Sequence, residues 1–213
     1  MEREITLPVA QDLVRELRVG DVLYLTGRFF TARDEAHHLM LERKAKGEEI
    51  PFDPSQMALF HCGPVVKEEG TGRPREISPP GAIPWGWRVI AAGPTTSARM
   101  EMFEDRFLSA FGVKIIIGKG GMGERTQRAL EAHGAVYTHY TGGAGALAAK
   151  AIEQVEDVFW LDELGMPEAV WIFRVKSFGP LLVTMDSTGG SLYTELAKTI
   201  AKNMVKIRER MKD

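Results

Sequence analysis

The sequence predicts an α/β fold in a single domain spanning residues 1–213, with a largely parallel or mixed central sheet. From residue 87 onward, apolar runs typical of strands alternate with amphipathic patterns typical of helices. The run at 113–117 is mostly β-branched, which is typical of a strand buried on both faces. A hydrophobic content of 44% over 213 residues is enough for one sizeable core.

In the N-terminal half, residues 22–30 are predicted to form a strand, followed by a helix that starts at Thr31. Thr31 and Asp34 have the spacing of a capping box, in which the hydroxyl and the acid each accept a hydrogen bond from a backbone N–H group. This interpretation places Arg33 in the first turn of the helix. The polar tract at 42–47 is expected to end it.

A second strand-like run at 56–66 leads into a segment at 67–84 that is rich in glycine, proline and charge. We predict that 67–84 is a long loop. Loops of this length are uncommon in a compact domain unless they cover a site or a partner. The segment is therefore expected to face a partner protein.

The C-terminal half has a βαβ-type layout. Strands are expected at 87–92, 113–117, 135–140, 169–175 and 181–186. Helices are expected from near residue 100 to 111, from the glycine loop at 118–123 to near 133–134, at 145–153 and at 193–211. Gly112 is expected to end the first of these helices as a C cap. The last helix is charged and amphipathic.

The most informative segment joins the strand at 87–92 to the helix that follows. It reads Gly93, Pro94, Thr95, Thr96, Ser97, Ala98 and Arg99. Free N–H groups and the positive end of a helix dipole favour an anion there, and the Arg99 guanidinium can bind a carboxylate or phosphate through two parallel hydrogen bonds. We interpret the segment as an anion-binding turn. The alternative is that Gly-Pro makes a tight turn and that Thr or Ser only caps the helix.

A second glycine loop follows the strand at 113–117. Gly118, Gly120 and Gly123 satisfy the G-x-G-x-x-G pattern of a dinucleotide site. Such a site needs an acid about 20 residues further on, and 138–141 contains none. A Walker phosphate loop is excluded because Lys119 is followed by Gly120 and not by Ser or Thr.

The remaining interpretation is that Lys119 lies in a glycine loop at the same sheet edge as the Thr95 turn. Ligands collect at the carboxyl ends of parallel strands. Arg99 and Lys119 are therefore expected to face one small dianion, with Arg33 as a third cation.

Composition excludes several function classes. A net charge of −2 with mixed signs argues against a nucleic-acid partner. The apolar runs are too short to span a membrane and the N-terminus lacks a signal sequence, so we expect a cytoplasmic protein. The single cysteine, Cys62, excludes an internal disulfide and a cluster bound by several thiolates of this chain, and is expected to be buried and structural. The five histidines lack a metal-binding spacing, so no metal site is assigned.

Several motifs together resemble a known family. They are Thr26-Gly27-Arg28, Ala32-Arg33-Asp34-Glu35-Ala36-His37, Cys62-Gly63-Pro64, Gly93 to Met100, Ile117 to Met122 and Met185-Asp186-Ser187. The chain is similar over almost its whole length to the β subunit, or C-terminal domain, of iron–sulfur hydro-lyases of the class I fumarase and L-tartrate dehydratase type. The resemblance implies a swivelling β/β/α domain. It also implies a [4Fe–4S] cluster that is bound by cysteines of a partner α subunit and not by this chain.

The resemblance also implies roles for six residues. Arg33, Arg99 and Lys119 correspond to cations that bind the substrate carboxylates. Thr95 corresponds to the residue that transfers a proton at the substrate carbon, and Thr96 to a neighbouring substrate contact. Ser97 stands where the family often has other small residues, so backbone contacts with substrate are expected there at most.

The leading hypothesis is the β subunit of a fumarate hydratase of the tricarboxylic acid cycle, assembled with an α subunit as α2β2. Its chemistry needs a Lewis acid on the leaving hydroxyl, a base at the adjacent carbon and cations for the developing charge. Tartrate dehydratase is the close alternative, because malate and tartrate differ by one hydroxyl. A module that binds a dicarboxylate without catalysis is the third possibility.

Overall fold

The computed structural model describes residues 1–68 and 86–211. Its strands are β1 (Glu2–Thr6), β2 (Val22–Thr31), β3 (Ala58–Phe60), β4 (Val65–Glu68), β5 (Trp87–Ala91), β6 (Ile115–Gly118), β7 (Val136–His139), β8 (Ile152–Phe159) and β9 (Val170–Met185). Its α-helices are α1 (Gln11–Glu16), α2 (Asp34–Ala45), α3 (Glu101–Phe111), α4 (Glu124–His133), α5 (Gly145–Lys150), α6 (Leu161–Leu164) and α7 (Leu192–Arg210), and short 3-10 helices cover η1 (Pro54–Gln56) and η2 (Ser97–Met100).

A seven-stranded mixed sheet forms the centre, in the order β1-β2-β3-β6-β7-β9-β8. The strands from β1 to β7 in this order pair in parallel, and β9 is antiparallel to β7, β8 and β2. Because β9 pairs with both β7 and β2, the strands β2, β3, β6, β7 and β9 close into a ring. The structure therefore confirms the α/β class and the mixed central sheet.

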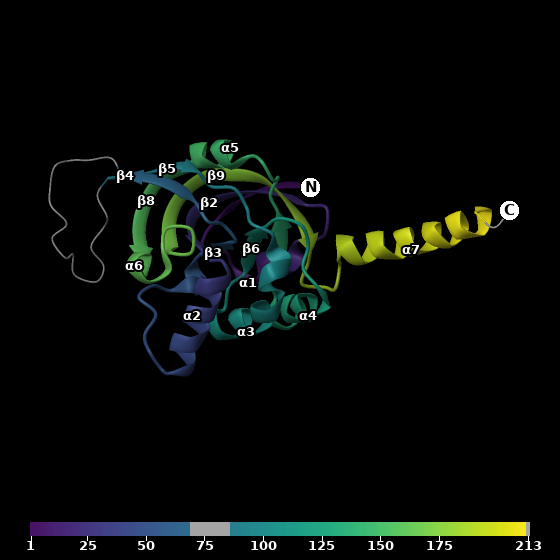
Figure 1. Cartoon of the computed structure of the whole chain (residues 1–213), viewed down its shortest axis with the longest axis horizontal. Helices are drawn as coiled ribbons and strands as arrows, with labels where there is room; N and C mark the ends of the chain where they lie inside the picture. Colours follow the sequence, from purple (N-terminus) through teal and green to yellow (C-terminus); the bar gives the residue numbers. More distant parts are fainter. Residues whose placement is uncertain (69–85, 212–213) are drawn as a thin grey trace.

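Side-chain alternation divides the apolar core into two clusters. Phe29 and Phe60 belong to a cluster with side chains from every strand of the ring, whereas their neighbours Phe30 and Leu59 pack with α2, α3 and α4. Successive residues of a strand point to opposite faces, so both faces of the ring strands are buried. Figure 1 shows α2, α3 and α4 together on one side of the sheet.

The predicted capping box is wrong. The helix starts at Asp34 with Arg33 as its N-cap residue, and Thr31 is the last residue of β2. The Thr31 hydroxyl is buried, donates to the Ala169 carbonyl at 3.3 Å and accepts from the Trp171 N–H at 3.0 Å. Thr31 therefore supports the contact between β2 and β9, because its hydroxyl is used across the sheet and not along the helix.

Three other expectations differ from the structure. The strands predicted at 169–175 and 181–186 are one continuous strand, β9, because both parts pair with β2. The helix predicted at 145–153 ends at Lys150 and strand β8 follows it. The elements β1 and α1 were not expected from the sequence.

The strand predicted at 87–92 lies outside the main sheet. β5 pairs with β4 in a separate two-stranded sheet. Consequently, residues 67 and 68 of the predicted long loop belong to β4. The rest of that loop, at 69–84, lies outside the described residues.

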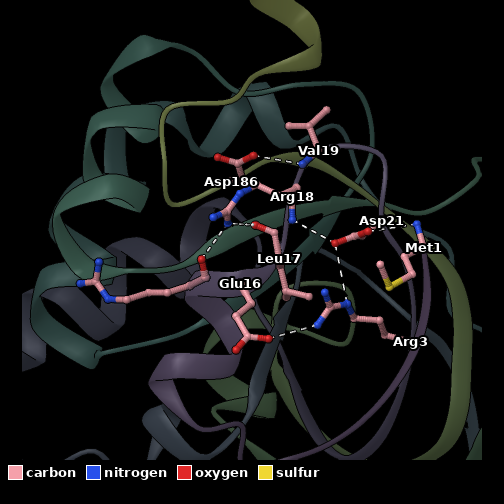
Figure 2. Close-up of polar contacts among 9 residues, drawn as sticks. Met1, Arg3, Glu16, Leu17, Arg18, Val19, Asp21 and Asp186 are labelled. Atoms are coloured by element: carbon pink, nitrogen blue, oxygen red, sulfur yellow. Dashed lines mark hydrogen bonds and ion pairs between the residues drawn. The ribbon is translucent and has the colours of Figure 1, made fainter.

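Two buried carboxylates hold the N-terminal part of the chain (Figure 2). Asp21 accepts from the Met1 ammonium and from the Arg18 N–H, both at 3.0 Å. Asp186, directly after β9, accepts from the Val19 N–H at 3.0 Å. Asp186 therefore connects the end of β9, the longest described strand, with the segment that leads into β2.

The C-terminal helix α7 extends away from the rest of the molecule in Figure 1. Its bounds agree closely with the predicted amphipathic helix. Among residues 1–68 and 86–211, none of the helices combines the length and the apolar content needed to cross a membrane.

Candidate functional site

Two short bridges join the Thr95 turn to the segment after β3 and to the Lys119 loop. Pro94 pairs with Cys62 in an antiparallel bridge, and Thr96 pairs with Lys119 in a parallel bridge. The Thr95 N–H donates to the His61 carbonyl at 2.7 Å, and the Ser97 N–H donates to the Lys119 carbonyl at 3.0 Å. The two loops are adjacent as predicted, but the cause differs, because β5 is not a strand of the main sheet.

The hydroxyls of Thr95 and Thr96 are available for a ligand. The Thr95 side chain is partly exposed and Thr96 is exposed. Thr96 precedes the 3-10 helix η2 but makes no side-chain cap. Within the described part of the chain, neither hydroxyl has a hydrogen-bond partner. The capping alternative is therefore not realised, and both hydroxyls can donate to or accept from a bound anion.

Ser97 differs from its neighbours because its side chain is fully buried. Its Oγ lies 2.9 Å from His61 Nδ1, accepts from the Tyr137 hydroxyl at 2.9 Å and accepts from the Lys119 N–H at 3.2 Å. A side chain at Gly118 would overlap this hydroxyl, which explains the glycine there. Both donors that Ser97 could offer to an anion, its hydroxyl and its N–H, are occupied within the chain.

The arginines expected to bind substrate each contact a carboxylate. Arg33 Nε lies 3.1 Å from Glu168 Oε1, and Arg99 forms a short ion pair with Asp34. Because Asp34 follows Arg33 directly, these four residues form one charged cluster at the start of α2. Burial raises the pKa of Glu168, although Arg33 and Arg99 both act against that rise. The structure thus brings Arg33 and Arg99 together.

Close packing fixes Arg33 from one side. A Cβ atom at Gly63 would lie 2.7 Å from Arg33 Nη1 and 2.6 Å from the Pro167 carbonyl oxygen. Real Cβ atoms do not approach other heavy atoms that closely, so this position is restricted to glycine. Gly63 therefore leaves the space that the Arg33 guanidinium occupies.

Lys119 differs from the arginines. Its side chain is partly buried and packs over Gly142, where an added Cβ would lie 3.0 Å from Lys119 Cδ. Among the residues that the structure describes, no carboxylate pairs with the Lys119 ammonium. This cation is available for an anion bound beside Thr96.

A carboxylate of the chain occupies the N-terminus of the helix after the Lys119 loop. Glu101 accepts from the Gly123 N–H at 2.7 Å and from the Thr126 hydroxyl at 2.7 Å. A side chain at Gly123 would collide with Glu101 Oε1 at 2.6 Å. The third glycine of the G-x-G-x-x-G pattern therefore serves this contact, which stands where a dinucleotide site would bind pyrophosphate.

Three further buried residues lie beneath the two loops. His37, His61 and Glu104 are fully buried, and Glu104 Oε2 lies 3.2 Å from His61 Nε2 and 3.6 Å from His37 Nε2. Sequence reasoning missed this cluster. The available signal was Glu104, a charged residue on the apolar face of helix α3, between Met100 and Phe107.

Cys62 is buried as expected. Burial raises the pKa of its thiol far above the usual range. A thiol buried in this way favours its protonated form, which is not the nucleophilic one.

Comparisons with known proteins identify the family of the chain. Residues 2–196 match the model of the family described as "Fumarase C-terminus". The chain is 40% identical to the L(+)-tartrate dehydratase subunit beta of Escherichia coli strain K12, over 95% of this chain and 92% of that protein. It is also 40% identical to a Methanocaldococcus jannaschii protein provisionally named as the same subunit, over 90% and 91% of the two chains. It is 39% identical to a Geobacillus stearothermophilus protein provisionally named as a class I fumarate hydratase, over 97% of this chain but 37% of that protein.

Proposed function

The chain belongs to the fumarase C-terminus family, and we propose that it is the β subunit of a hydro-lyase that adds water reversibly to fumarate and gives L-malate. The observation that carries this proposal is the Thr96–Lys119 bridge. It joins the turn that holds two hydroxyls to the loop that holds an ammonium, and among the described residues none of these three groups has a partner. This set of groups suits a small dicarboxylate. The relatives named above are hydro-lyases by name, which supports the same class of reaction.

In this proposal, Arg33, Arg99 and Lys119 bind the two substrate carboxylates. The carboxylates of Glu168 and Asp34 hold the two guanidiniums in place before substrate arrives, so less entropy is lost on binding. Preorganised cations also stabilise negative charge that develops on the substrate carboxylate during proton removal.

Thr95 is the proposed proton-transfer residue, and Thr96 is a proposed substrate contact. A threonine hydroxyl is a weak base unless a neighbouring group accepts its proton. No carboxylate among the described residues contacts the Thr95 hydroxyl, so we assign that role to a residue of the partner subunit. Ser97 has its hydroxyl and its N–H occupied within the chain, so its proposed contribution is to hold the backbone of the turn.

The residues of this chain do not fit an iron–sulfur cluster. Such clusters are held by several cysteine thiolates, whereas this chain has one cysteine, whose thiol is buried. We therefore assign the [4Fe–4S] cluster to an α subunit. An α partner agrees with the name "subunit beta" of the tartrate dehydratase relatives. As the family resemblance implies, we propose a cytoplasmic α2β2 enzyme that acts in the tricarboxylic acid cycle.

A second candidate function is dehydration of L(+)-tartrate. The tartrate dehydratase subunits match this chain over nearly their whole length, whereas the fumarate hydratase relative is covered over 37%. Tartrate carries one hydroxyl more than malate, and a site that hydrogen-bonds this hydroxyl can reject the analogue that lacks it.

One experiment tests both candidates. The chain is co-expressed anaerobically with its α partner, and kcat/KM is measured on fumarate, L-malate and L(+)-tartrate. Preference for fumarate and malate supports the first candidate, and preference for tartrate supports the second. A colourless monomer that binds dicarboxylates but forms no complex would reject both and would support the non-catalytic binding module.

A further inference from the structure

The buried cluster of His37, His61 and Glu104 connects the separate parts of the proposed site. Glu104 comes from α3, His37 from α2, and His61 follows β3. All three side chains have 0% exposure, so none of them touches a substrate bound at the surface. An isolated buried charge is costly, so the positive and negative charges of this cluster must cancel.

The groups around His37 favour a positively charged ring. Its Nδ1 lies 2.7 Å from the Arg33 carbonyl oxygen, which can only accept, so Nδ1 carries a proton. Its Nε2 faces Glu104 Oε2 at 3.6 Å. A neutral ring would direct a lone pair at the carboxylate, whereas an imidazolium forms an ion pair with it. Burial alone would raise the pKa of Glu104, but the two imidazoles outweigh it and lower the pKa to about 2.

His61 is neutral in this arrangement, because a second imidazolium beside the single Glu104 carboxylate would leave an uncompensated buried charge. Burial also lowers the pKa of its ring. Its Nε2 lies 3.2 Å from the Glu104 carboxylate, so the proton belongs on Nε2. Nδ1 is then an acceptor for the Ser97 hydroxyl at 2.9 Å. The two lone pairs of Ser97 Oγ accept from Tyr137 and from the Lys119 N–H. With His37 charged and His61 neutral, one imidazolium faces one carboxylate at ion-pair distance, and the cluster carries no net charge.

This line reaches the backbone of three residues that the proposed function assigns to substrate. His37 Nδ1 donates to the Arg33 carbonyl oxygen, and the Ser97 hydroxyl oxygen accepts from the Lys119 N–H. The His61 carbonyl oxygen accepts from the Thr95 N–H at 2.7 Å. We propose that Glu104 is a positioning residue, which fixes the protonation of His37 and His61 and thereby sets the places of Arg33, Thr95 and Lys119. The proposal rests on the proposed function of these three residues.

A divalent metal is the competing explanation for the cluster. The ligand atoms of His37, His61 and Glu104 lie within 4.8 Å of one another, and each Nδ1 has an outer partner, as in many metal sites. The metal-free arrangement is favoured because the charges of His37 and Glu104 cancel each other. In addition, the described residues contribute three ligands to this enclosed position, whereas structural zinc takes four.

Kinetics of the assembled enzyme test the positioning role. Glu104→Gln keeps the shape of the side chain and removes its charge. We expect it to raise KM at least tenfold, with Glu104→Asp restoring part of the loss. The control is Leu108→Ala, one turn further along α3, which is also fully buried but packs in the apolar cluster. It should lower the melting temperature and the active fraction while leaving KM within twofold.

A second measurement does not depend on turnover. Nitrogen NMR of the full-length chain labelled with ¹⁵N-histidine reports which ring nitrogens carry protons. We expect both nitrogens of His37 and Nε2 of His61 to be protonated in the wild type, and Glu104→Gln to remove the Nε2 proton of His37. These outcomes hold or fail even if the enzyme acts on another substrate.

Three results would overturn the proposal. One is an unchanged KM in an assembled and active Glu104→Gln enzyme. Another is a neutral His37 in the wild-type chain. The third is about one equivalent of zinc or another non-iron metal per chain that the Glu104→Gln variant loses, because the cluster would then be a metal site.

Discussion

Thr96 and Lys119 face each other in a parallel β-bridge, although their segments follow strands of two different sheets. β5 precedes the Thr95 turn and pairs with β4, whereas β6 precedes Lys119 and is central in the main sheet. The bridge therefore places the two loops next to each other, although the strands that precede them do not belong to one sheet. It joins the turn of Thr95 and Thr96 to the loop of Lys119, and the predictions for Thr95 and Lys119 depend on it.

Arg99→Ala should reduce activity strongly and stability little. A charge-assisted contact that is preorganised for the transition state contributes roughly 2–4 kcal/mol, so kcat/KM should fall about 30- to 1,000-fold. The ion pair with Asp34 is about half exposed on the Arg99 side, and such pairs contribute only about 0–1 kcal/mol to folding. Steady-state kinetics and thermal unfolding of the assembled enzyme measure both effects. Unchanged turnover would reject the assignment of Arg99.

Thr95→Val should stop proton exchange at C3 of malate without impairing assembly. Valine has a similar shape, and no described residue loses a hydrogen bond to the Thr95 hydroxyl. Exchange is followed by NMR in deuterated buffer, with Thr96→Val as the control that keeps Thr95. Normal exchange in Thr95→Val would remove this hydroxyl from the mechanism.

Lys119→Met should mainly raise KM, because the ammonium is proposed to bind a carboxylate in the ground state as well as in the transition state. Methionine retains part of the aliphatic stem that packs over Gly142. Lys150→Met is the control, since Lys150 is an exposed lysine at the end of α5. Equal KM values for the two variants would indicate that Lys119 is an ordinary solvated lysine.

Gly63→Ala should act on catalysis through Arg33. The new methyl group would lie 2.7 Å from Arg33 Nη1, so the guanidinium must move. We expect KM to rise about as much as in Arg33→Ala. In a double-mutant cycle, Gly63→Ala should add little to KM once Arg33 has been removed. Additive effects on KM would show that Gly63 acts by another route, such as its contact with the Pro167 carbonyl.

Protonation of Asp186 should lower the free energy of unfolding at acid pH. Burial opposes ionisation, but N–H groups of Val19, Thr188 and Gly190 and the Thr188 hydroxyl outweigh it and lower the pKa of Asp186 below its usual 3.8. A folded-state pKa below the unfolded one means that the stabilisation is complete above about pH 4 and is lost as the pH falls further.

Urea unfolding of the wild type and of Asp186→Asn measures this contribution. We expect the variant to lose roughly 1–3 kcal/mol at neutral pH, because the amide cannot accept every hydrogen bond. The difference between the two proteins should shrink toward about pH 3. A difference that stays constant over this range would show that ionisation of Asp186 does not contribute.

Local pattern was sufficient for much of the fold. The hydrophobic periods located β2, β6, β7, α3, α4 and α7, because each period reflects one buried face of one element. Residue types in the two loops also pointed to an anion site before any contact was known. This prediction needs only the chemistry of single side chains, namely the hydroxyls of Thr95 and Thr96 and the cations of Arg99 and Lys119.

Tertiary structure decided the rest. Contacts between distant segments determine three features: the pairing of β9 with both β2 and β7, the separate β4–β5 sheet, and the partners of Thr31. Such contacts leave no local period. Glu104 is the clearest case, because in the sequence it is one acid in a charged helix. Only the packing of α3 against α2 and β3 places its carboxylate between two buried imidazoles, where water is excluded and each proton must have a partner.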